Sequence, residues 1–152
     1  SWQNQPLPTF EQVLATLKKT SSRLAIANPE IAPYGKAAKQ TLIALELWPQ
    51  VSKRLVTGIN VNQSFLQVRS GAAPLGLVAH SQLKQNNLTG VLVPQTLYSP
   101  IIQQLAITKS SDQQHKAKQL SDYLLNALTQ EKLAHLGYKA LSTEHFARAS
   151  SQ

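Results

Sequence analysis

The sequence has 152 residues, 42% of them hydrophobic and 14% charged, and 15 Lys and Arg against 7 Asp and Glu give a net charge of +8. This length suits about one domain, and no apolar run approaches the ~18 residues that a membrane span needs. The absence of cysteine excludes disulfides, thiolate metal sites and thiol catalysis. Because the chain also lacks methionine and opens on Ser1, we expect it to be processed or cut from a longer protein.

The first half of the chain predicts helices that alternate with short apolar strands. Thr9 and Gln12 have capping-box spacing, and apolar residues at i, i+3, i+4 and i+7 then predict a helix over 10–19. The elements expected next are a strand over 23–27, an ordered loop over 28–35, a helix over 35–47 stopped at Trp48-Pro49, a strand over 54–57, and a helix that begins at a second capping box, Asn60–Gln63, and ends at Ser70-Gly71.

The second half continues this alternation. The strands expected there lie over 75–79 and 91–94, separated by a polar loop over 82–87, and over 101–108. A third capping box (Ser111 and Gln114) opens a helix with Leu120, Leu124, Ala127 and Leu128 on one stripe. A last helix over 130–136 is stopped by Gly137. The final dozen residues lack a pattern, and we expect them to fray. Strands that alternate with helices predict an α/β fold, with a parallel sheet covered by helices on both faces.

The sequence gives no sign of an enzyme or of a bound cofactor. The four histidines, His80, His115, His135 and His145, show no metal-ligand spacing, and the seven carboxylates are too scattered to suggest an acid–base pair. No nucleophile elbow, Walker loop or dinucleotide-binding glycine motif occurs. We therefore expect no catalytic residues, metal site or cofactor.

The distribution of charge points to an anionic ligand. No acidic residue occurs between Glu46 and Asp112, while five basic residues lie in that stretch. This pattern is typical either of a solvated basic face or of a lobe kept free of carboxylates because its ligand is an anion. A nucleic-acid-binding domain is a weaker alternative, because the basic residues are not clustered and no recognition motif appears.

Two predicted helix starts sharpen the hypothesis of an anion site. Pro33 suits the first helical position, which makes the N–H groups of Tyr34 and Gly35 donors of the first turn, and Asn60, Val61 and Asn62 open the next helix similarly. Both starts follow a strand, so both lie at the carboxyl edge of a parallel sheet, where two helix N-termini can hold a small dianion without Lys or Arg. The alternative is that both are ordinary helix starts.

Four runs of the sequence resemble one protein family. The run RLAIANPEIAPYGKAAKQTL (23–42), followed by matching runs over 55–83, 93–108 and 123–138, resembles periplasmic molybdate-binding proteins, the substrate-binding components of molybdate ABC transporters. The set of motifs NPE-x-APYG, G-x-NV and G-x-A-x-x-G-x-V is specific, although each alone is weak. The resemblance implies a type II periplasmic binding fold, whose two lobes close on molybdate or tungstate.

The resemblance also implies which residues bind the ligand. Tyr34 and Val61 would donate backbone N–H groups to the oxyanion, with Gly35, Asn60 and Asn62 as weaker candidates. Some members add a tyrosine hydroxyl at the position of Ala79, so that contact is absent here and the Tyr34 side chain would serve instead.

The resemblance further implies that residues 20–98 form the second, anion-binding lobe, and that 1–19 and 99–152 form the hinge crossover and the C-terminal part of an incomplete first lobe. The family's opening first-lobe segment carries the other half of the ligand shell and is not in this sequence. We therefore expect that half from another chain or from domain-swapped self-association. The expected function is delivery to the membrane component of an ABC importer in the periplasm, with no nucleic-acid partner. The alternative is a shortened sensing or structural protein that does not bind tightly.

Overall fold

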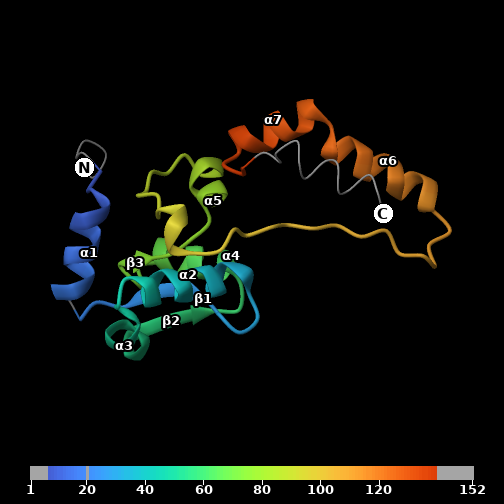
Figure 1. The fold of residues 1–152 in the computed structure, drawn as a ribbon. Helices are drawn as coiled ribbons and strands as arrows, with labels where there is room; N and C mark the ends of the chain where they lie inside the picture. Colours follow the sequence, from blue (N-terminus) through green and yellow to red (C-terminus); the bar gives the residue numbers. More distant parts are fainter. Residues whose placement is uncertain (1–6, 20, 140–152) are drawn as a thin grey trace. The chain divides into compact units, whose positions relative to one another are not determined.

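The computed structural model describes residues 7–19 and 21–139, and the chain divides into unit 1 (Ser1–Ile101) and unit 2 (Ile102–Gln152) (Figure 1). Within the described residues, one parallel sheet of order β2-β1-β3 forms the centre of unit 1. Its strands are β1 (Leu24–Ala27), β2 (Leu55–Gly58) and β3 (Leu75–Gly76). The predicted α/β class with a parallel sheet is confirmed.

Helices cover both faces of this sheet, because successive side chains of β1 point to opposite faces and those on both faces are apolar. Leu24 and Ile26 pack in one core cluster with Ala38 and Leu42 of α2 (Pro33–Ala44). On the other face lies α4 (Val61–Arg69), where a Cβ placed on Gly76 would meet a Val68 methyl at 2.4 Å and the Ala25 Cβ at 3.3 Å. All four β1 side chains are therefore buried, as expected of a strand covered on both faces.

Helix α1 (Phe10–Lys19) packs onto the same core through Leu17 and begins at the predicted capping box. The Thr9 N–H donates to Gln12 Oε1 at 2.7 Å, and the Gln12 N–H donates to Thr9 Oγ1 at 3.3 Å. At its C-terminus, the Arg54 guanidinium donates to the Leu17 carbonyl. These contacts fix α1 to unit 1, whereas the predicted division into lobes at 20–98 stays a prediction.

The helix expected over 35–47 is shorter at its C-terminus, because it ends in a left-handed residue. Glu46 has φ 58°, and the Leu47 N–H donates to the Leu42 carbonyl at 2.8 Å, which closes a Schellman turn. Leu47 then enters the core beside Leu42. Trp48-Pro49 was predicted only to stop the preceding helix. In the structure these residues also begin the short helix α3 (Trp48–Val51), which continues into η2 (Ser52–Arg54).

Three predictions for residues 75–94 were partly or wholly wrong. The strand expected over 75–79 is limited to the two residues of β3, and residues 91–94 form no strand because they pair with no neighbour in the described sheet. The polar loop expected over 82–87 is largely helix α5 (His80–Gln85), followed by Asn87 in the left-handed region and, later, by η3 (Gln95–Leu97). Gln82 supports this helix by accepting the Ala79 N–H through Oε1 at 3.2 Å.

Unit 2 contains α6 (Gln114–Leu125) and α7 (Ala127–His135) among its described residues. The strand predicted over 101–108 is wrong: this segment has no regular structure, since no described neighbour accepts its hydrogen bonds. Ser111 does not cap α6, and its Oγ accepts from the Gln113 N–H instead. The predicted stripe is broken at Asn126, which caps α7, whereas the stop at Gly137 (φ 93°) is confirmed. The predicted fraying of the last dozen residues lies outside the described residues.

Candidate functional site

The carboxyl ends of β1 and β2 lie side by side, and a helix begins just beyond each of them. Ala27 is paired with Gly58 at the end of the parallel register, and the Asn28 N–H donates to the Gly58 carbonyl at 2.7 Å. Figure 1 shows α2 and α4 starting at this edge of the sheet. Ligands of open α/β sheets bind at this edge, so the predicted helix-start residues occupy the expected place.

Asn28 organises the loop that leads into α2. Its side-chain Oδ1 accepts the Glu30 N–H at 2.9 Å, and its carbonyl accepts the Ala32 N–H at 2.9 Å. Pro33 then takes the first helical position, as predicted, and the first hydrogen bond of the helix runs from the Lys36 N–H to the Ala32 carbonyl at 3.0 Å. Asn28 was not among the predicted site residues, although asparagine is typical of such turns.

Glycines allow the first turn of each helix to lie directly against a strand end. A Cβ on Gly35 would lie 2.3 Å from the Ala27 carbonyl oxygen, and a Cβ on Gly58 would lie 2.8 Å from both the N and the Oγ of Ser64. Neither approach is possible with a side chain present. Gly35, predicted as a weaker ligand candidate, therefore has a packing role that was not predicted from the sequence.

The start of α4 confirms the predicted cap and adds one feature. Asn60 has extended backbone angles (φ −148°, ψ 174°), and its Oδ1 accepts the Gln63 N–H at 2.9 Å. The Gln63 side chain reaches back one residue beyond the cap and accepts the Ile59 N–H at 2.7 Å. Val61 is the first helical residue, so its N–H has no acceptor within the helix. Asn62 is exposed, and its Oδ1 accepts from Gln82 Nε2 at 3.5 Å.

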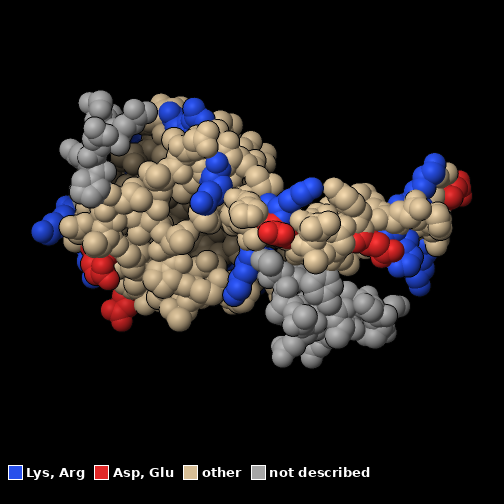
Figure 2. Space-filling model, turned by 90° about the horizontal axis from the view of Figure 1, so that it is seen from above, with Lys and Arg blue, Asp and Glu red and all other residues tan. Residues whose placement is uncertain are grey.

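Charges around these two helix starts are sparse. Glu30, in the loop before α2, is paired with Lys39 at 3.1 Å. On the face of unit 1 shown in Figure 2, the Lys and Arg side chains are scattered over a largely uncharged surface. In the part of the chain that the structure describes, no three potential metal-ligating side chains come together, and no helix is long and apolar enough to cross a membrane.

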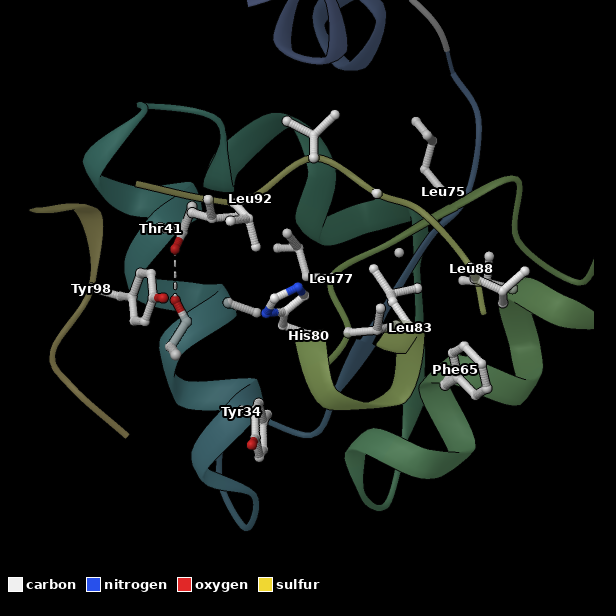
Figure 3. Close-up of a pocket in the computed structure, with 18 of the residues that line it drawn as sticks. Tyr34, Thr41, Phe65, Leu75, Leu77, His80, Leu83, Leu88, Leu92 and Tyr98 are labelled. Atoms are coloured by element: carbon white, nitrogen blue, oxygen red, sulfur yellow. Dashed lines mark hydrogen bonds between the residues drawn. The ribbon is translucent and has the colours of Figure 1, made fainter. Parts of the chain in front are cut away.

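A cavity of about 410 Å³ lies in unit 1 between α2, β3, α5 and the segment 88–93. Most of its walls are aliphatic, and His80 and Tyr98 contribute polar groups (Figure 3). Tyr34 lines this cavity, whereas Val61, Asn60, Asn62 and Gly35 do not. The cavity and the pair of helix starts are therefore neighbouring features that share the residue Tyr34.

Known proteins similar to this chain indicate its family. Residues 2–139 match the family of bacterial extracellular solute-binding proteins. The molybdate-binding protein ModA of Azotobacter vinelandii is 37% identical over 141 residues, which are 90% of this chain and 56% of that protein. ModA of Rhodobacter capsulatus is 34% identical over 125 residues, covering 82% of this chain and 50% of the relative.

A solved structure gives the same result for the fold. The periplasmic molybdate-binding protein of Azotobacter vinelandii superposes with a TM-score of 0.77 at 34% identity, covering 83% of this chain and 58% of that one. The chain thus spans between half and three fifths of the length of these relatives. The predicted resemblance is confirmed at the level of the family, since the match extends over nearly all described elements. The chain belongs to the bacterial extracellular solute-binding protein family.

Proposed function

We propose that this chain forms the oxyanion-binding part of a periplasmic solute-binding protein that captures molybdate or tungstate for an ABC importer. It would bind the ion without transforming it and without a cofactor. The main donors are the backbone N–H groups of Tyr34 and Val61, with Gly35, Asn60 and Asn62 in supporting positions. The observation that carries the proposal is that α2 and α4 start beside each other at the carboxyl edge of β1 and β2, in a chain similar to molybdate-binding proteins.

This arrangement suits a fully ionised oxyanion better than a protonated one. Helix N-termini carry a partial positive charge and present N–H donors, which stabilise a dianion without Lys or Arg. Backbone donors offer no acceptor for the O–H of HPO₄²⁻, and an unpaired O–H in a closed site weakens binding. Molybdate and tungstate are therefore the proposed ligands, and phosphate is expected to bind more weakly.

The proposal divides the ligand shell between two parts. Residues 20–98 would supply the anion-binding lobe, and 1–19 with 99–152 would supply the crossover and part of the other lobe. Unit 2 exposes apolar side chains suited to a complementary segment: Ile102 (60% exposed), Leu120 (58%), Tyr123 (56%) and Leu128 (73%). The proposed partners are thus a first-lobe segment from another chain, or a second copy by domain swapping, and the membrane component of the importer.

The test is a titration of the ¹⁵N-labelled chain, in an assembly that carries both halves of the ligand shell, with sodium molybdate at constant ionic strength. We expect the amide signals of Tyr34, Gly35, Val61 and Asn62 to shift, with tungstate equivalent and phosphate weaker. A sensing or structural protein without affinity for oxyanions would give no such shifts. Equal shifts with phosphate would contradict the donor-only site.

Light scattering of the purified chain tests the proposed partner surface. Exposed apolar area of this kind favours association, so we expect particles larger than a monomer at high concentration. A strictly monomeric particle in the absence of any partner would overturn the domain-swapping part of the proposal.

A further inference from the structure

Three helices in unit 1 have glutamine, rather than glutamate, at the third helical position, where the side chain can cap the helix. The third helical residue is Gln12 in α1, Gln63 in α4 and Gln82 in α5, and each side-chain Oε1 accepts a backbone N–H at the start of its helix. Glutamate makes the same hydrogen bond and adds a favourable interaction with the positive end of the helix. For the helix alone, glutamate is therefore at least as good a residue as glutamine.

Two of these glutamines lie beside the proposed oxyanion site. Gln63 accepts the Ile59 N–H at 2.7 Å and so holds the backbone just before Asn60 and Val61. Gln82 links the next helix start to the same turn, because its Nε2 faces Asn62 Oδ1 at 3.5 Å while its Oε1 accepts the Ala79 N–H. The first turn of α4 is thus supported on both sides by uncharged amides.

A carboxylate at either place would repel the proposed ligand. At position 63 it would stand within the first turn of α4, whose N-terminus faces the dianion, and at position 82 it would stand beside Asn62 of the same turn. Like charges at such separations oppose each other appreciably near a protein surface. No acidic residue occurs between Glu46 and Asp112, so the whole segment that contains α4 and α5 is free of carboxylates. Glu30, in the loop before α2, has its charge compensated by Lys39.

We propose that Gln63 is a positioning residue for the oxyanion site and that its neutrality is a determinant of affinity: it orders the turn carrying the Val61 N–H without placing a negative charge beside the ligand. This inference rests on the proposed function. It assigns Gln82 the same role at the neighbouring helix start, through Asn62. A purely structural role would require only the hydrogen bond, which glutamate also makes.

The substitution Gln63→Glu separates these two roles. It keeps the acceptor for the Ile59 N–H, so the temperature of unfolding should stay the same or rise. The dissociation constant for molybdate, measured from the shifts of the Val61 amide at low ionic strength, should rise about tenfold. Because the repulsion is screened by salt, the difference from wild type should shrink as ionic strength increases.

The matched control is Gln12→Glu. Gln12 makes the same kind of bond at 2.7 Å on α1, which Figure 1 places away from the starts of α2 and α4. Its substitution should leave the affinity for molybdate unchanged. If the wild type gives no molybdate shifts in an assembly that carries both halves of the ligand shell, the proposed function and this inference are both overturned. If the wild type binds and Gln63→Glu binds equally well, or Gln12→Glu loses as much, only the inference is wrong.

Discussion

The two units use similar helices but differ in what those helices bury. In unit 1, β1 is buried on both faces. The helices α1, α2 and α3 contribute Leu17, Leu42 and Val51 to the core of this unit. In unit 2, the described residues include no buried hydrophobic side chain, and Leu128 is 73% exposed although α7 is well formed. Both units nevertheless contain a helix with an asparagine cap, at Asn60 and at Asn126.

This difference shows which structural features are local and which depend on partners. A helix satisfies its backbone hydrogen bonds internally, so a cap and a few turns suffice to define it. A strand requires a neighbour, and the apolar segment 102–108 therefore stays irregular while β1, with the same kind of composition, is paired on both edges. Apolar composition alone does not decide between these outcomes.

The largest expected effect is the difference in the free energy of unfolding between a variant in the core of unit 1 and a variant on the surface of unit 2. Ile26 is fully buried in β1, so Ile26→Ala should lower the free energy of unfolding by about 2–5 kcal/mol. Leu128→Ala, in unit 2, should change it by less than about 0.5 kcal/mol because the side chain is exposed in the isolated chain. Urea denaturation followed by circular dichroism measures both. A large loss for Leu128→Ala would mean that unit 2 is buried against a partner in solution.

The next effect concerns binding rather than folding. Val61→Pro removes one N–H at the first helical position, where proline is well tolerated, and the extended Asn60 suits a following proline. It should lose a charge-assisted hydrogen bond worth about 1.5–3 kcal/mol, or roughly 10- to 150-fold in affinity. Val61→Ala should cost far less, and Ala127→Pro, at the same position of α7, should not affect affinity.

These variants are compared by calorimetry with molybdate, in an assembly that carries both halves of the ligand shell. If Val61→Ala loses as much affinity as Val61→Pro, the side chain matters and the main-chain mechanism is wrong.

A third effect tests the close approach of α2 to β1. Gly35→Ala places a methyl group 2.3 Å from the Ala27 carbonyl oxygen, so the helix start must move and stability should fall by about 1–3 kcal/mol. Gly71→Ala is the control: Gly71 has φ 77° and open space around it, so only its backbone conformation is strained. Amide signals at the end of β1 should shift in the first variant alone. Unchanged signals there would show that the turn absorbs the methyl group.

Local signals in the sequence were enough to place most helices and the candidate site. The capping boxes at Thr9 and Asn60, the proline at the first position of α2 and the glycine after α7 all depend on neighbours within a few residues. The two helix starts follow from these signals together with the parallel order of the strands. Their placement at one sheet edge could therefore be predicted.

The errors arose where a distant or unusual contact decides the structure. The strand expected over 91–94 has the right composition but no described partner, and α2 ends early because Glu46 adopts a left-handed conformation that favours glycine. The helix α5 was missed because its polar residues, including the capping Gln82, are also typical of a loop. The role of Asn28 depends partly on Gly58, which is thirty residues away in sequence and adjacent only after the sheet forms.

The smallest expected effect compares the same interaction in the two units. Asn60 and Asn126 each accept a backbone N–H three residues on, at 2.9 and 2.8 Å. Replacing either with alanine should cost its helix about 1 kcal/mol, and replacing it with glycine should cost only a few tenths of a kcal/mol.

In unit 1, α4 packs on the sheet, so Asn60→Ala should lower the unfolding temperature of the whole unit. In unit 2, α7 buries no apolar residue, so Asn126→Ala should speed amide hydrogen exchange within α7 and leave β1 protected. Exchange measured residue by residue tests this contrast. Faster exchange in β1 after Asn126→Ala would show that the two units unfold together.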